Sequence, residues 1–446
     1  MIDKEYKYLT KLGLPVVIGQ LGIMIQGVID TIMLGHYSTV ALASAGFVNS
    51  LFTLVSVIVM GLSFAILPLC GSAYGRNDTA ECGRVLKNGL FAVFLFSIVG
   101  MAVMMLLFAN VHVLKQPEEL IPSILKYFWW TIPSMVFVAV SSAFKSFFDS
   151  ITQTKVAMWA ILVGNVWNVI WNFLLIFGLC GFPELGVVGA AIATLTSRFV
   201  ILLIYVAGLI FHRSFRPYLQ AFLQSRLSRT DVVEIFRMGL PTSVQCGLEV
   251  SSFSICTIFV GWLGTNAQAA QQIMINLSAI IWVVYNGIGM AVGVRVSNFL
   301  GMKNYAGIRH ASLCGIKMIL CCAVVLNLLF YVFHMQIFAW FTSDGEITLL
   351  LVSLIMPIIL YQFGDALQTN FVNVLRGLGC VRYLMLDAFI AYMVVSLPLS
   401  YTLAIPCGFG LVGIWMGFPF GLSTAAALYI WRYRKAVGSE KINVME

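Results

Sequence analysis

Long apolar runs separated by short polar breaks make up most of the chain. The run that starts at Leu90 reads LFAVFLFSIVGMAVMMLLFA and contains no charged residue. A transmembrane helix needs about 20 consecutive apolar residues, whereas the strands of a membrane barrel alternate apolar and polar positions. The unbroken runs therefore predict an all-α integral membrane protein. Its twelve transmembrane helices are expected at residues 11–35, 44–74, 88–111, 121–146, 156–179, 186–211, 237–263, 273–300, 309–333, 347–375, 382–405 and 409–431.

The composition excludes a soluble protein. Of the 446 residues, 60% are hydrophobic and 10% are charged, and the mean hydropathy is +0.95. A soluble domain carries about 25% charged residues, and a disordered chain is more polar still. The first apolar run continues to Gly35 without the pattern of a cleaved signal peptide, so we interpret it as a span. The ten cysteines form no CxxC pair and lie mostly in apolar runs, so we expect neither a disulfide nor a metal site among them.

Basic residues are distributed unevenly between the predicted connections. All but four of the 26 Lys and Arg residues fall at the two termini or in and beside the even-numbered connections. Lys115 and Lys126 belong to odd-numbered connections, and Arg198 and Lys317 fall within spans. By the positive-inside rule, both termini are expected to face the cytoplasm. This topology accounts for the net charge of +8, so no nucleic-acid partner is expected.

The longest connection divides the chain into two halves. We expect an N-terminal six-helix lobe at residues 1–212, a cytoplasmic amphipathic linker at 213–236 and a C-terminal six-helix lobe at 237–446. The linker spaces Arg213, Arg216, Arg226 and Arg229 among Phe, Leu and Val residues. This pattern predicts a helix that lies on the anionic inner leaflet. Whether it only joins the lobes or also regulates the protein or binds a partner stays open at this point.

The two halves repeat one another. Gly13-Leu14-Pro15 matches Gly239-Leu240-Pro241 at an offset of 226 residues, and Pro133 matches Pro357 at an offset of 224. Small residues allow helices to approach closely and proline bends a span, so these residues recur where backbone geometry recurs. Each half has six spans and starts on the same side, which makes the repeat parallel. Two bundles related by a pseudo-twofold axis are typical of transporters, with substrate between the bundles and alternating access by rocking.

Three carboxylates stand inside apolar spans, at Asp30, Glu249 and Asp365. A charge at the centre of a span costs about 2.5–3.5 kcal/mol on insertion scales. One interpretation pairs each carboxylate with a helix dipole or a distant base. The other, which we favour, is binding of a cation or proton in a wet cavity, because an acid without hydration is suited to reversible protonation.

Polar residues in the first half form an ordered stripe. Asn168 and Asn172 are four residues apart on the fifth predicted span, so they share a face, and Asn165 continues that face. Amide and carboxylate oxygens suit a small hard cation such as Na⁺, so Asp30, Asn168 and Asn172 are candidate ligands. Thr194 on the sixth span can add a hydroxyl. The alternative for the amides is hydrogen bonding between helices without a ligand.

The second half has a matching arrangement. Tyr361 and Asp365 are four residues apart on the tenth span, with Gln362 beside them. Gln245 lies four residues before Glu249 on the seventh span and shares its face. Glu249 and Asp365 are therefore candidates for cation or proton binding, and hydrogen bonding between helices is again the alternative for the amides.

At these positions the chain resembles the multidrug and toxic compound extrusion (MATE) family over nearly its whole length. Acids in both halves are most similar to its NorM-like bacterial branch. The residues that carry the resemblance are Gly13-Leu14-Pro15, Val28 to Met33 with Gly35, Asn168 to Asn172, Gly189 to Thr194, Gly239-Leu240-Pro241 with Glu249, and Tyr361 to Asp365 with Leu375-Arg376-Gly377.

The resemblance implies an exporter of organic cations in the bacterial inner membrane, driven by Na⁺ or H⁺ and not an enzyme. It implies a monomer, no cofactor, and small-molecule drugs and the lipid bilayer as partners. It also implies that the first cation site consists of Asp30, Asn168, Asn172 and Thr194. It implies that the second cation and substrate site consists of Glu249, Tyr361 and Asp365. Gln245, which shares a helix face with Glu249, is a further candidate for substrate binding. Several members of the family have an acid where Asn172 stands, so the coupling ion stays open.

Two other functions fit the pattern less well. A flippase for lipid-linked saccharides needs a basic cavity for pyrophosphate, whereas the charges in the middle of these spans are mostly acidic. An integral membrane transferase needs a DxxxD cluster or a histidine inside the membrane, and the five histidines lie at or near span ends. The pattern therefore favours a transporter, without naming its natural substrate.

Overall fold

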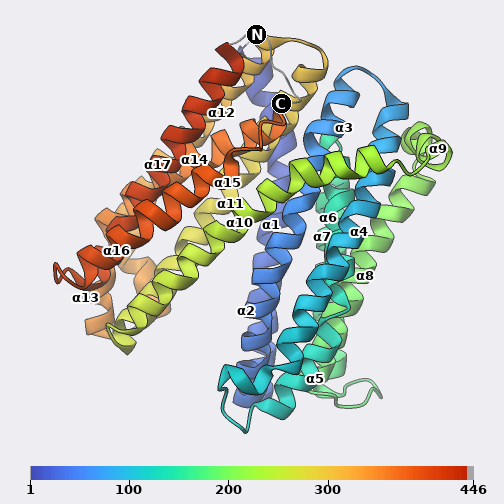
Figure 1. Cartoon of the computed structure of the whole chain (residues 1–446). Helices are drawn as coiled ribbons and strands as arrows, with labels where there is room; N and C mark the ends of the chain where they lie inside the picture. Colours follow the sequence, from blue (N-terminus) through green and yellow to red (C-terminus); the bar gives the residue numbers. More distant parts are fainter. Residues whose placement is uncertain (1, 439–446) are drawn as a thin grey trace. The chain divides into compact units, whose positions relative to one another are not determined.

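A computed structural model describes residues 2–438, and every regular element in this part of the chain is helical (Figure 1). The first half contains α1 (Ile2–Tyr37), α2 (Thr39–Gly61), α3 (Ile66–Gly75), α4 (Thr79–Ala109), α5 (Ile121–Thr131), α6 (Ser134–Ser150), α7 (Thr154–Phe177) and α8 (Val187–Phe211). After the short α9 (Arg216–Gln224), the second half contains α10 (Arg229–Gly261), α11 (Thr265–Gly301), α12 (Tyr305–Phe341), α13 (Gly345–Ser353), α14 (Ile355–Gly377), α15 (Leu384–Ala388), a π-helical turn (Phe389–Ser396), α16 (Leu397–Ala404) and α17 (Gly410–Gly438).

The helices account for the twelve predicted spans. By length and composition, ten helices within residues 2–438 are able to cross a membrane, or twelve if each bent pair is one span. The two bent pairs are α5 with α6, at 40°, and α13 with α14, at 46°. Both were expected as single spans, at 121–146 and 347–375. They bend near Pro133 and Pro357, where a proline ring removes a backbone hydrogen bond.

The chain forms two compact units. One contains residues 18–243, and the other contains the chain up to Val17 together with the chain from Val244 onward. The first parts of α1 and α10 thus belong to a different unit from the rest of each helix. The linker predicted at 213–236 contains α9 and the first turns of α10. The lobes expected at 1–212 and 237–446 stay a prediction.

The internal repeat is visible in the backbone. Asn77 and Lys303, 226 residues apart, both have left-handed backbones, with φ of 59° and 54°. In each half the following residue caps a long helix, because the Asp78 side chain accepts a hydrogen bond from the Glu81 N–H and the Asn304 side chain accepts one from the Gly307 N–H. The two halves therefore use the same turn and cap at the same point, as a parallel repeat requires.

Glycines allow close helix contacts at equivalent places in each unit. A Cβ added at Gly189 would lie 2.5 Å from the Leu175 carbonyl oxygen, where α7 meets α8. A Cβ added at Gly413 would lie 2.6 Å from the Ala404 backbone nitrogen, where α16 meets α17. Without a hydrophobic driving force between helices in lipid, such close backbone approach supplies much of the attraction.

The outer surfaces of the units are apolar and polar side chains are inside. Large hydrophobic side chains such as Leu106, Trp340 and Leu349 are 65%, 82% and 72% exposed. By contrast, Asn168 and Gln362 are fully buried. This inverted distribution is expected where lipid, not water, covers the helices.

We predict that Gly189→Ala destabilises the protein by about 1–3 kcal/mol, because the added methyl group overpacks a backbone contact. Thermal unfolding of the purified protein in detergent measures the effect. Gly46→Ala is the matched control, since a Cβ at Gly46 meets nothing within 4 Å. Equal melting temperatures for the two variants would contradict the close packing of α7 and α8.

Candidate functional site

The sequence-predicted residues of the first half meet in the unit formed by residues 18–243. The Asn172 side-chain amide donates to Asp30 Oδ1 at 2.5 Å and to Asn168 Oδ1 at 3.1 Å. The Asn168 amide donates to Thr194 Oγ1 at 3.4 Å. Helices α1, α7 and α8 therefore bring Asp30, Asn168, Asn172 and Thr194 into one continuous chain of hydrogen bonds.

This cluster keeps unused hydrogen-bonding capacity. Asn172 Oδ1 is buried and has no hydrogen-bond partner among the described residues, and neither has either polar atom of the Asn165 side chain. Asn165 also faces α1, because a Cβ at Gly22 would lie 2.9 Å from its Nδ2 atom. Buried polar atoms without partners indicate a place for water or an ion.

A basic residue stands beside this cluster. Arg198 lies one helical turn after Thr194, donates to Ser134 Oγ and places its guanidinium 4.1 Å from the centre of the Phe52 ring. It interacts electrostatically with Asp30, although the described residues show no ion pair between them within 4 Å. Arg198 is therefore a base, distant in sequence, that interacts with Asp30 without forming an ion pair with it. This agrees in part with the interpretation that each buried acid is paired with a distant base. Arg198 follows Thr194 by four residues, so both lie on one face of α8. This spacing is the sequence signal that could have associated Arg198 with the cluster.

In the second half, Glu249 is connected to an arginine through an amide. Gln245 Nε2 donates to Glu249 Oε2 at 3.0 Å, and Arg376 Nη2 donates to Gln245 Oε1 at 2.6 Å. Arg376 is 7% exposed, and it also interacts electrostatically with Glu249. The bridging amide therefore presents its donor end to the carboxylate and its acceptor end to the guanidinium. Arg376 directly follows the span predicted at 347–375, and nothing in the sequence pattern predicts this link.

Asp365 has a different environment. It is 1% exposed, and its Oδ1 accepts a hydrogen bond from the Thr369 hydroxyl at 3.3 Å. Its Oδ2 is buried without a hydrogen-bond partner among the described residues, as are both polar atoms of Gln362. Asp365 and Glu249 interact electrostatically, so they lie in the same interior. Among the described residues, Glu249 therefore has the Gln245 amide and, behind it, Arg376, whereas Asp365 has one hydrogen bond and one oxygen without a partner.

Aromatic rings surround Tyr361 on the side of α10 and α17. Its ring centre lies 6.4 Å from that of Phe253, 5.9 Å from that of Trp415 and 6.2 Å from that of Phe418. The Tyr361 side chain interacts electrostatically with Asp365. Rings beside a carboxylate suit an organic cation that carries its own aromatic groups, although the same rings also pack the core of this unit.

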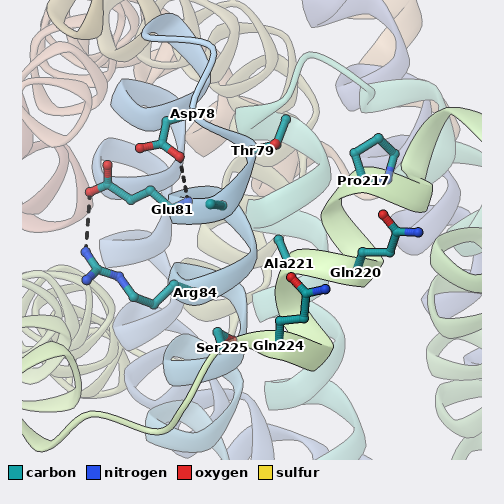
Figure 2. A pocket seen from close by; sticks show the side chains of 10 residues that line it. Asp78, Thr79, Glu81, Arg84, Pro217, Gln220, Ala221, Gln224 and Ser225 are labelled. Carbon is teal, nitrogen blue, oxygen red and sulfur yellow. Dashed lines mark hydrogen bonds and ion pairs between the residues drawn. The ribbon is translucent and has the colours of Figure 1, made fainter.

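Two other features lie apart from these clusters. Asp387 lies near the start of the span predicted at 382–405, where a charge at the membrane interface would be expected. It is instead 1% exposed and forms a double hydrogen-bonded ion pair with Arg432 at 3.1 Å. A pocket of about 620 Å³ lies between α4 and α9 and is lined on one side by Asp78 and Glu81 (Figure 2). Their carboxylates are engaged, with the Glu81 N–H and with Arg76 respectively.

The described residues contain no group of three His, Cys, Asp or Glu side chains suited to a metal ion. All ten cysteines are free thiols. A cation held by the clusters described above would therefore be bound by amide, hydroxyl and single carboxylate oxygens.

Proteins named as multidrug resistance proteins match nearly the whole chain. The NorM multidrug resistance protein of Aliivibrio fischeri is 28% identical over 440 residues, which cover 96% of this chain and 94% of that protein. A protein of Rhizobium meliloti described as a probable NorM is 29% identical over 95% of this chain and 91% of its own length.

Solved structures show the same fold. A eukaryotic MATE transporter has a TM-score of 0.88 at 21% identity, with both chains covered completely. A MATE transporter of Vibrio cholerae has a TM-score of 0.87 at 20% identity over 99% of each chain. The model of the MatE family matches residues 15–174 and again residues 241–402, once in each half of the repeat. The chain therefore belongs to the MatE family, with the two-repeat, all-helical fold of MATE transporters.

Proposed function

We propose that this protein is a multidrug antiporter that exports organic cations by alternating access and couples export to the entry of Na⁺ or H⁺. The observation that carries the proposal is a set of carboxyl groups inside apolar helices, Asp30 in one unit and Glu249 with Asp365 in the other. Ionisable residues inside a membrane mark ion and substrate pathways, because they are too costly to keep otherwise. The relatives named multidrug resistance proteins support drugs as substrates.

The first cluster is proposed as a cation site. Asp30, Asn168, Asn172 and Thr194 supply a carboxylate, two amides and a hydroxyl within one hydrogen-bonded chain. Such hard oxygen donors suit Na⁺, and the carboxylate alone suits H⁺. A cation bound there compensates the negative charge of the Asp30 carboxylate. Without a cation, the Asn172 amide stabilises that charge by donating a hydrogen bond to it.

The second cluster is proposed to bind both coupling cation and substrate. Two carboxylates in one poorly solvated interior do not both ionise cheaply, so Glu249 and Asp365 share a proton as a coupled pair. An organic cation favours loss of that proton, and protonation favours release of the organic cation. Competition of this kind couples ion entry to drug export without a covalent step. Tyr361 and Gln245 line the same cluster and are proposed to contact substrate.

Further parts of the proposal follow from the transport reaction. No bond is made or broken, so we propose neither enzymatic activity nor a resident cofactor. The protein is proposed to act as a monomer in the bacterial inner membrane. The distribution of Lys and Arg supports cytoplasmic termini.

Efflux from proteoliposomes tests the proposal directly. The purified protein is reconstituted, the vesicles are loaded with a fluorescent organic cation, and an inward gradient of either Na⁺ or H⁺ is imposed. We expect export with at least one gradient and collapse of export when an ionophore removes it. Export at the same rate without any gradient would contradict the coupling.

For the first cluster, we predict that Asp30→Asn abolishes gradient-driven efflux, because a neutral amide at this position removes the negative charge that attracts the cation and cannot exchange a proton. Glu118→Gln is the matched control, since Glu118 is an exposed carboxylate in a connection. The measurement is efflux per folded protein, with folding checked by melting temperature. Normal coupled efflux by a well-folded Asp30→Asn variant would exclude the role proposed for Asp30.

A second variant separates a ligand from a packing residue. Removal of the amide in Asn172→Ala withdraws a hydrogen bond from a partly buried carboxylate, a change of about 1–3 kcal/mol. If Asn172 takes part in cation binding, Asn172→Ala weakens that binding. A loss of about 1.4 kcal/mol of binding free energy raises the cation concentration for half-maximal efflux roughly tenfold. An unchanged ion dependence together with a lower melting temperature would assign Asn172 to packing alone.

Glu249 and Asp365 are predicted to differ in both transport and stability. Asp365→Asn should reduce export of cationic drugs more than export of zwitterionic drugs and leave the melting temperature nearly unchanged, since Asp365 Oδ2 has no partner to lose. Glu249→Gln should impair export of both classes. It should also lower the melting temperature, because it removes the carboxylate that faces Arg376 through Gln245. Identical behaviour of the two variants would rule out the unequal pair.

A further inference from the structure

The connection between α8 and α10 is rich in basic residues. Residues 212–230, called here the basic strap, contain four arginines and neither Asp nor Glu. All four are exposed, and none forms a salt bridge with a described residue. They are Arg213, Arg216, Arg226 and Arg229.

The position of the basic strap is fixed by the helices at its ends. Helix α8 ends at Phe211 and α10 begins at Arg229, and both helices are long and apolar enough to span a membrane. A connection of this length between two spans lies at the boundary of the apolar layer. Its exposed side chains include Leu223 and Leu227, which are 66% and 53% exposed, and Phe211 directly before it, at the end of α8, is 79% exposed.

The other face of the basic strap is packed against its own unit. Phe215 is 3% exposed and its ring centre lies 5.3 Å from that of Phe148, while the Tyr218 ring lies 5.8 Å from that of Phe147. Burial against these rings raises the pKa of the Tyr218 hydroxyl. The strap is therefore a docked element and presents a defined outer face.

Hydrogen bonds fasten the strap to α4. Lys87 Nζ donates to the Ser225 carbonyl oxygen at 2.5 Å, and the Ser228 N–H donates to Asn88 Oδ1 at 2.8 Å. At Gly83 an added Cβ would lie 2.6 Å from the backbone nitrogen of Phe222, so α9 lies directly on the α4 backbone. The pocket in Figure 2 lies beside this contact.

We propose that the basic strap binds the headgroups of anionic phospholipids in the leaflet next to it. Guanidinium groups match phosphate oxygens with paired hydrogen bonds. The apolar side chains that flank them fit the boundary between headgroups and acyl chains. Each arginine near an anionic surface strengthens binding by roughly fivefold. An acidic protein partner would use the same charges but would not need exposed Phe and Leu at the level where the spans end.

A lipid-binding assay on the whole protein tests this proposal without measuring transport, so its failure is distinguishable from failure of the antiport. Detergent-solubilised protein is titrated with phosphatidylglycerol that carries a fluorophore on an acyl chain, and then with labelled phosphatidylcholine. The variant replaces all four arginines by glutamine. The control removes the same charge from other exposed positions, with Lys4→Gln, Lys7→Gln, Lys11→Gln and Lys303→Gln.

We expect the wild type to prefer phosphatidylglycerol, and the arginine variant to bind it at least ~10-fold more weakly, while the lysine control stays within about twofold of wild type. High salt should weaken wild-type binding, because exposed charges are screened over about 8 Å at physiological ionic strength. The salt dependence is measured on the wild-type protein alone, so it tests the proposal even if the arginine variant fails to fold.

Three outcomes would overturn the proposal. The first is equal affinity of the arginine variant and the wild type for phosphatidylglycerol. The second is wild-type affinity that does not change with salt. The third is complete competition by inorganic phosphate at low concentration, which would assign the arginines to a soluble anion.

Discussion

A carboxyl group in an apolar helix has to find polar partners inside the protein, and this requirement organises the interior of both compact units. Lipid offers no hydrogen bonds, so a missing partner costs more there than at an aqueous surface. Asp30 finds the Asn172 amide, and Glu249 finds Gln245 with Arg376 behind it. Asp365 finds only the Thr369 hydroxyl for one oxygen. The differences between these environments, and not the mere presence of acids, are what separate the proposed roles.

The repeat duplicates the frame of the protein but not its chemistry. The left-handed turn, the helix cap and the glycine contact recur at corresponding positions in each half. At the offsets of 226 and 224 residues, however, Asp30 corresponds to Cys256, Glu249 to Ile23 and Asp365 to Ser141. Backbone geometry depends on a few small and turn-forming residues, which both halves keep. The polar sites depend on single side chains, so each half has its own.

The connection between the halves follows a different rule from the spans. Its inward face packs through rings and backbone contacts, and its outward face keeps arginines without acidic partners. In membrane proteins generally, an excess of Lys and Arg in the connections on one side sets the orientation. The strap concentrates part of that charge on a segment whose position against α4 is fixed. Charge that is held in place is able to recognise headgroups as well as to orient the chain.

The amino-acid pattern alone determined the spans, the repeat and the residues that share one helix face, such as Asn168 with Asn172 and Tyr361 with Asp365, because these features are local to one helix or recur along the chain. It did not predict the link from Gln245 to Arg376, which are 131 positions apart, nor the bond from Arg198 to Ser134, 64 positions apart. Periodicity fixes the face of a helix on which a residue lies, but not which other helix covers that face. In lipid that choice depends on the fit between surfaces of small residues and on hydrogen bonds between helices, so only the tertiary structure decided how each buried acid is partnered.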